Sequence, residues 1–140
     1  MDAIMKLTLL LIFIAFRCHG MSQIDALSML ESGNNDFAHG RSHEVSRWQM
    51  LPSVWRSHTR LPLSASTNAI TAQRVALAVL QERVTAFVVR YHREPTPFET
   101  YVLWNPRCPK ETAQRFANLC HPPSNEMKAG RMPSGSDCDK

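Results

Sequence analysis

Glu31 is the residue of this sequence whose type and position best suit acid–base chemistry. With Ile24 and Leu27 it occupies positions i, i+3 and i+7, so a helix would carry all three on one face. Desolvation on that apolar face disfavours the carboxylate, and the negative end of the helix dipole disfavours it further. Both effects predict a raised pKa, which a general acid requires. The competing interpretation is an ordinary solvent-exposed carboxylate at the end of a helix.

A polar segment follows Glu31 and closes on Gln49, which has an apolar residue on each side and Pro52 three positions on. Residues 33–47 are rich in turn-forming and hydrogen-bonding side chains, which predicts a loop or a short hairpin. Such a loop would place polar groups beside the acid. The segment also contains a second acidic residue, Glu44. Its competing interpretation is a solvated charge paired with a neighbouring arginine, Arg41 or Arg47.

The helix that carries Glu31 has clear limits, with Ser22 as N-cap, Asp25 three residues later and Gly33 as the stop. After the loop, Pro52 predicts a short helix around Ser53–Arg56.

A long helix is predicted to start near Asn68 and to end at Glu94-Pro95. Its apolar stripe is expected to consist of Leu77, Leu80, Val84, Phe87, Val88 and Tyr91. Thr96-Pro97-Phe98-Glu99 combines an N-cap, a Pro at N1 and a Glu at N3, which predicts the start of another helix. A last helix is expected over Glu111–Leu119. The fold class expected is mainly α.

The basic residues are scattered along the chain, whose formal net charge is +4. A nucleic-acid-binding surface would normally concentrate them on one element, so nucleic acid is not an expected partner. A generally basic surface suits an anionic polymer such as a bacterial cell wall.

Residues 1–20 have the features of a secretory signal peptide, and the apolar run from Leu7 to Phe16 is too short for a membrane span. Export is therefore expected, with one domain over residues 21–120 and a disordered tail over residues 121–140. Two alternatives stay open, a lipid anchor at Cys18 and a cytoplasmic chain that starts at Met21.

Three cysteines follow the signal segment, Cys108, Cys120 and Cys138. A straight helix between Cys108 and Cys120 would hold them roughly 15 Å apart at about 1.5 Å per residue. A disulfide needs Cα atoms about 4.4–6.8 Å apart, so any bridge is expected to use Cys138. No metal-ligand spacing occurs, and no metal or cofactor is expected.

The block from Glu31-Ser32-Gly33 to Gln49-Met50-Leu51-Pro52 resembles the lytic transglycosylases of the lysozyme-like superfamily. Those proteins have a Glu-Ser pair, a loop that ends in a Gly-Leu-Met-Gln-Ile-Met-Pro type segment, and later an Ala-Tyr-Asn-x-Gly segment. Asn68 to Phe87 resembles the helix that follows in the family, and Leu103-Trp104-Asn105 lies where the Tyr-Asn segment would fall. This chain departs from the pattern at Gly40, where the family often has Ser, and at Trp104, which replaces the Tyr.

The resemblance implies an α+β lysozyme-like domain that cleaves peptidoglycan, with Glu31 as the single acid and base. It implies a monomer in the periplasm or outside the cell, with glycan strands as its partner. Ser32, Gln49 and Asn105 would then hold sugar groups, and Trp104 or Tyr101 would stack on a sugar ring. Tyr101 is also the residue that could supply the missing phenol.

Each of these residues has a structural interpretation as well. Gln49 would close the loop by a hydrogen bond, Ser32 and Asn105 would cap helices, and the two aromatic residues, Tyr101 and Trp104, would pack in the core.

Other functions stay open from the sequence. Glu44 as a second carboxylate would suit a hydrolytic muramidase, because such an enzyme orients a water molecule or stabilises an oxocarbenium ion. A second alternative is a protein without catalytic activity that has the same lysozyme-like fold and binds glycan or serves as a structural protein of the envelope. A third alternative is a small secreted basic protein outside the family.

Overall fold

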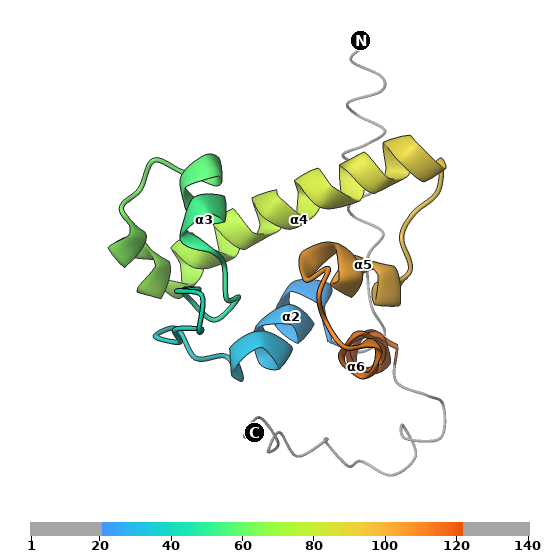
Figure 1. Ribbon diagram of the computed structural model, residues 1–140, viewed down its shortest axis with the longest axis horizontal. Helices are drawn as coiled ribbons and strands as arrows, with labels where there is room; N and C mark the ends of the chain where they lie inside the picture. The colour runs from blue at the N-terminus through green and yellow to red at the C-terminus, as the bar shows by residue number, and fades with distance from the viewer. Residues whose placement is uncertain (1–20, 122–140) are drawn as a thin grey trace.

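The computed structural model describes residues 21–121 and is mainly helical (Figure 1). The elements are α2 (Gln23–Ser32), α3 (Pro52–His58), the 3₁₀-helix η1 (Leu63–Thr67), α4 (Ala69–Tyr91), α5 (Pro97–Trp104) and α6 (Lys110–Cys120). The expected signal peptide, and all of the expected tail except His121, lie outside the described residues.

Helix α4 is the longest element and runs along one side of the molecule (Figure 1). Helices α3 and η1 pack against its N-terminal half, while α2 and α5 contact it further along. Helix α6 packs on both α2 and α5. The helix that carries Glu31 is therefore surrounded by elements that come later in the chain.

The helix limits follow the capping chemistry expected from the sequence. The Ser22 hydroxyl accepts from the backbone N–H of Asp25 at 3.3 Å. Gly33 ends α2 in the left-handed region at φ 64°, which glycine adopts without steric cost. At the start of α5, Thr96 and Glu99 form a complete capping box. These predicted starts and stops are confirmed.

The apolar stripe predicted for α4 is partly wrong. Leu77 and Tyr91 are 39% and 53% exposed, and the helix ends at Tyr91, before the expected Glu94-Pro95. The buried residues of α4 are Ala72, Val75, Ala76, Val79, Leu80, Val84 and Phe87. The buried face thus begins on small alanines, where helices approach closely, and alanines carry little apolar signal in a sequence.

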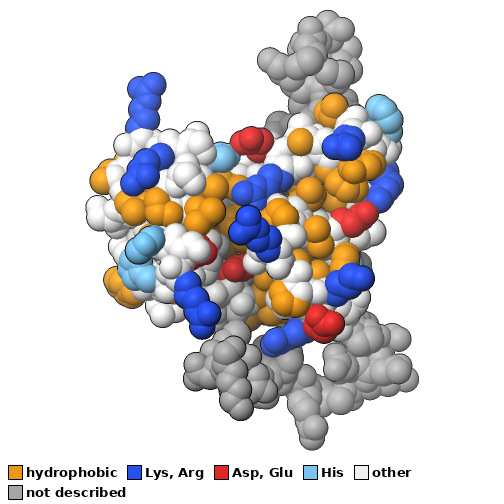
Figure 2. All heavy atoms as spheres, in the orientation of Figure 1, with side chains coloured by type: hydrophobic (Ala, Val, Ile, Leu, Met, Phe, Trp, Pro, Cys, Tyr) orange, Lys and Arg blue, Asp and Glu red, His pale blue; other side chains and the backbone are white. Residues whose placement is uncertain are grey.

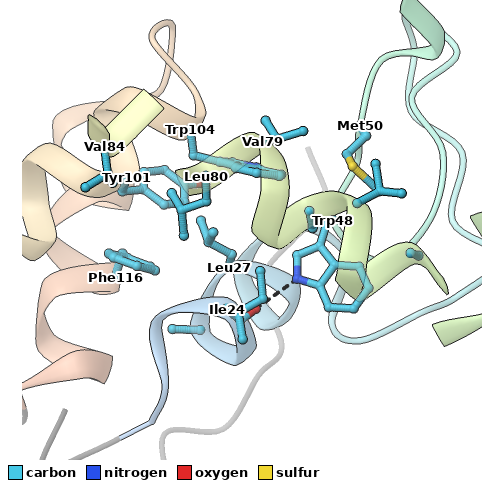
Figure 3. Packing of buried hydrophobic residues seen from close by; sticks show 14 of the residues in the cluster. Ile24, Leu27, Trp48, Met50, Val79, Leu80, Val84, Tyr101, Trp104 and Phe116 are labelled. Atoms are coloured by element: carbon cyan, nitrogen blue, oxygen red, sulfur yellow. Dashed lines mark hydrogen bonds between the residues drawn. The ribbon is translucent and has the colours of Figure 1, made fainter. Parts of the chain in front are cut away.

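The core lies between α2, α4, α5 and α6, and Trp48 enters it from the loop (Figure 3). The indole N–H of Trp48 donates to the carbonyl oxygen of Ile24 at 2.9 Å. Because Ile24 is in the first turn of α2, this bond ties the loop to the start of that helix. Tyr101 packs on Phe116 with ring centroids 5.3 Å apart.

Residues 33–51 form a compact loop with little regular pairing. Val45 makes antiparallel bridges with both His39 and Met50. The chain therefore turns twice, once between His39 and Val45 and once between Val45 and Met50. The expectation of a loop or short hairpin is met by these isolated bridges.

Two surface properties bear on partners. Figure 2 shows Lys and Arg side chains spread over the visible face instead of gathered in one tract. Among residues 21–121, no helix is long and apolar enough to cross a membrane.

Candidate acid–base site

Glu31 lies in the last turn of α2, one residue before the helix ends, and is only partly exposed. The Tyr101 hydroxyl donates a hydrogen bond to Glu31 Oε1 at 2.8 Å. Tyr101 is 2% exposed and comes from α5, so the tyrosine that holds Glu31 is itself fixed in the core. The structure therefore gives the carboxyl group a rigid partner from a distant part of the chain.

Burial raises the pKa of Glu31, because desolvation penalises the charged form. The hydrogen bond from Tyr101 acts in the opposite direction, since it stabilises the carboxylate. The negative charge of Glu44 raises the pKa further, and a hydrogen bond with the Asn105 side chain lowers it. The net direction is upward, so the carboxyl group is biased toward its protonated form. This direction agrees with the sequence-based expectation.

Glu44 and Gln49 converge on Gly40 in the loop that faces Glu31. A β-carbon on Gly40 would lie 2.1 Å from Glu44 Oε2 and 2.7 Å from Gln49 Oε1. Any larger residue would overlap these two side chains, so glycine is needed for this close approach. The departure from the family pattern at Gly40 thus has a local reason.

The Glu44 carboxylate accepts from the backbone N–H of Ser42 at 2.8 Å. The expected alternative, an ion pair of Glu44 with Arg41 or Arg47, is not found among the described residues. Arg47 instead pairs with Asp36 through two hydrogen bonds of 2.6 and 2.7 Å. This bidentate pair joins the two sides of the loop.

Gln49 closes the loop by a hydrogen bond, as the structural alternative predicted, whereas Ser32 bonds the loop backbone and does not cap a helix, since the cap of α2 is Gly33. Gln49 Nε2 donates to the carbonyl of Ser46 at 3.0 Å, and its backbone is in the left-handed region at φ 48°. The Ser32 hydroxyl accepts from the N–H of Asn35 at 3.1 Å and donates to the carbonyl of Arg47 at 2.8 Å. Both residues brace the loop beside Glu31.

The C-terminal end of α5 brings the remaining candidates to the site. Trp104 is 8% exposed and belongs to the core, so its ring has little free face for stacking on a sugar. Asn105 caps α5 through its backbone N–H, and its side chain lies close enough to Glu31 to favour the carboxylate and lower its pKa. The ring of Tyr101 is packed in the core, as that of Trp104 is, and only the Tyr101 hydroxyl reaches the site.

Cys108 is a half-buried free thiol just after this turn, and no bond joins it to Cys120. The absence of that bridge was expected from the helix between the two residues. Cys138, the alternative partner in the sequence analysis, lies outside the described residues.

Sequence reasoning missed two contributors to the site. The Asp36–Arg47 pair has no spacing signal, because its members are brought together only by the loop conformation. Arg83 was also missed, although it falls between Leu80 and Phe87 on the buried side of α4. The sequence signal for Arg83 was its place as a charged residue within the apolar stripe of this helix.

Among residues 21–121, no group of His, Cys, Asp or Glu side chains is arranged to hold a metal ion. No protein-family model, curated protein or solved structure matches the chain. The side chains that the structure brings together at the site are a carboxyl group with a raised pKa, a phenol, amides and a second carboxylate.

Proposed function

We propose that this protein is a peptidoglycan lytic transglycosylase with a lysozyme-like domain. It would cleave the β-1,4 bond between N-acetylmuramic acid and N-acetylglucosamine with Glu31 as its single acid and base. The observation that supports this proposal best is the partly buried Glu31 with its raised pKa and its 2.8 Å hydrogen bond from Tyr101. The substrate class rests on the resemblance of the Glu31-Ser32 and Gln49 to Pro52 blocks.

The proposed reaction needs one carboxyl group. Protonated Glu31 donates its proton to the glycosidic oxygen, and the bond from that oxygen to C1 of the muramyl sugar breaks. The resulting Glu31 carboxylate accepts the proton of the muramyl 6-hydroxyl, whose oxygen bonds to C1 and closes a 1,6-anhydro ring. The nucleophile belongs to the substrate, so proximity replaces a second catalytic group.

Tyr101 and Asn105 would hold the carboxyl group in place through both steps. Their hydrogen bonds stabilise the carboxylate that exists between the two proton transfers. Burial does the reverse and favours the acid at the start. The opposition of these effects suits a group that must first give up a proton and then take one.

A hydrolytic muramidase is the second candidate function, because the charge of Glu44 acts on Glu31 from the facing loop. In that reaction Glu44 would orient a water molecule or stabilise the oxocarbenium ion, and the product would carry one added water.

Mass spectrometry of the fragments released from purified peptidoglycan tests the proposal. The expected products are anhydromuramyl fragments, absent with Glu31→Gln and retained with Glu44→Gln. Products that carry an added water and disappear with Glu44→Gln would establish the hydrolytic reaction instead.

The remaining alternative is a protein that binds glycan without cutting it. Sedimentation with insoluble peptidoglycan, unaffected by Glu31→Gln and accompanied by no released fragments, would contradict the enzyme proposal. The proposed location is the bacterial periplasm or the cell exterior, and the proposed working form is a monomer.

A further inference from the structure

Arg83 occupies an unusual place for a charged residue, on the side of α4 that faces the end of α5. Its Nη1 atom donates to two backbone carbonyls, those of Leu103 at 3.0 Å and Trp104 at 2.6 Å. The guanidinium carbon lies 5.5 Å from the centroid of the Trp104 ring. The side chain is half-buried, and this burial lowers the pKa of Arg83.

These contacts meet a specific need of the helix end. The last carbonyls of a helix have no partner within the helix, and they form the negative end of its dipole. Arg83 supplies a donor and a positive charge to two of them. The cost of burying part of an arginine is offset by these charge-assisted hydrogen bonds.

The peptide group between Trp104 and Asn105 is consequently held from both sides. Its oxygen accepts from Arg83, and its N–H donates to the carbonyl of Tyr101 at 2.8 Å. This peptide leads directly into Asn105, whose side chain reaches Glu31. Tyr101, on the same short helix, is the other hydrogen-bond partner of Glu31.

We infer that Arg83 is a positioning residue for the acid–base site, which fixes the end of α5 so that Asn105 meets Glu31. Arg83 does not touch the reacting atoms and acts through the Trp104–Asn105 peptide. This inference rests on the proposed function for its effect on catalysis, but its effect on Glu31 is independent of the substrate.

The titration of Glu31 gives a measurement that needs no activity. Loss of the Asn105 contact removes an interaction that favours the carboxylate, so the pKa of Glu31 should rise. We expect Arg83→Met and Asn105→Ala each to raise it, as followed by NMR of the labelled Glu31 carboxyl carbon. Arg90→Met, at an exposed position on the same helix, is the matched control and should leave it unchanged.

A double-mutant cycle separates placement from charge. If Arg83 acts through Asn105, Arg83→Met should add nothing to the titration shift in the Asn105→Ala background. Full additivity would mean that Arg83 acts on Glu31 by its charge alone, and that would overturn the inference. An unchanged titration in the folded Arg83→Met variant would also overturn it, since the residue would then support stability only.

Arg83→Lys extends the test if Arg83→Met does not fold. It keeps the charge but loses the planar guanidinium, so we expect a smaller shift in the same direction and again no further shift in Asn105→Ala. If the titration shifts of Arg83→Lys and Asn105→Ala are additive, the inference is likewise overturned.

Kinetics then connect the inference to the proposed function. With peptidoglycan fragments as substrate, Arg83→Met should lower kcat by about 10- to 100-fold, the size expected for a misplaced catalytic group, with little change in KM. A loss confined to KM would contradict the positioning role. If the wild-type protein releases no fragments while the titration coupling persists, the proposed function fails and the positioning role stands.

Discussion

Glu31→Gln should stabilise the folded protein at neutral and alkaline pH, although it removes the proposed catalytic group. Gln has nearly the same shape as Glu, and its side-chain oxygen can still accept from the Tyr101 hydroxyl. What changes is that Gln never becomes charged. The variant therefore measures the cost of keeping a carboxylate at this position.

The sign follows from the direction of the pKa shift. The pKa of Glu31 is raised above its ordinary value of 4.5 in the folded protein. Folding is therefore favoured by Glu31 below pH 4.5, and this contribution is lost as the pH rises through the folded-state pKa. Wild type and Glu31→Gln should have similar stability at pH 4 and diverge as the pH is increased.

The size follows from opposing contributions. The cost of burial exceeds the stabilisation by Tyr101 and Asn105, because the pKa is raised despite both hydrogen bonds. Each unit by which the pKa of Glu31 is raised corresponds to a stability difference of about 1.4 kcal/mol at pH values well above that pKa. In a domain of about 100 residues, each kcal/mol corresponds to a Tm higher by about 4–8 °C.

Thermal unfolding at several pH values between 4 and 8 is the assay. Glu94→Gln, a change at an exposed carboxylate, is the control and should follow the wild-type curve. A Glu31→Gln variant that is less stable than wild type at pH 8, or equally stabilised at every pH, would refute the reasoning.

Further predictions concern the elements that hold the site. Trp48→Phe removes the indole donor to the carbonyl of Ile24, which keeps its helical hydrogen bond, and should lower the free energy of unfolding by about 0.5–1.5 kcal/mol, measured in denaturant; an unchanged midpoint would contradict the tie between loop and α2. Gly40→Ala should fold normally, within about 1 kcal/mol of wild type, because only the flexible ends of side chains must move. The release of anhydromuramyl fragments should be retained in this variant, since the proposed reaction does not use the Glu44 carboxylate that is displaced; a loss of activity would favour the hydrolytic reaction instead. Thr96→Ala removes the N-cap of α5 and should cost about 1 kcal/mol in thermal unfolding; an unchanged Tm would show that the capping box does not stabilise the helix.

The sequence was sufficient for features that depend on local chemistry. The start of α2 at Ser22, its end at Gly33 and the capping box at Thr96 all follow from interactions within a few residues. The direction of the pKa shift at Glu31 was also predictable, because one of its two expected causes, desolvation on the apolar face of α2, is the largest cause in the structure. These are short-range effects that a single sequence contains.

Features that depend on packing between distant segments were not predictable in the same way. The burial of Ala72 and the exposure of Leu77 depend on which side of α4 its neighbours cover. The Tyr101 hydroxyl was considered only as a replacement for a missing phenol, and its bond to Glu31 required the docking of α5. Arg83 is an intermediate case: its position within an apolar helix face is visible in the sequence, but its two acceptors are backbone carbonyls, which residue types do not reveal.

The bond between Tyr101 and Glu31 joins residues 70 positions apart. A chain that ended before α5 would contain the acid and its loop but neither of the side chains that hold the carboxyl group. The connection at His92, Arg93 and Glu94 is exposed, so a protease has access to it. After a cut there, only the non-covalent packing of α5 and α6 against the rest of the fold would keep Tyr101 beside Glu31.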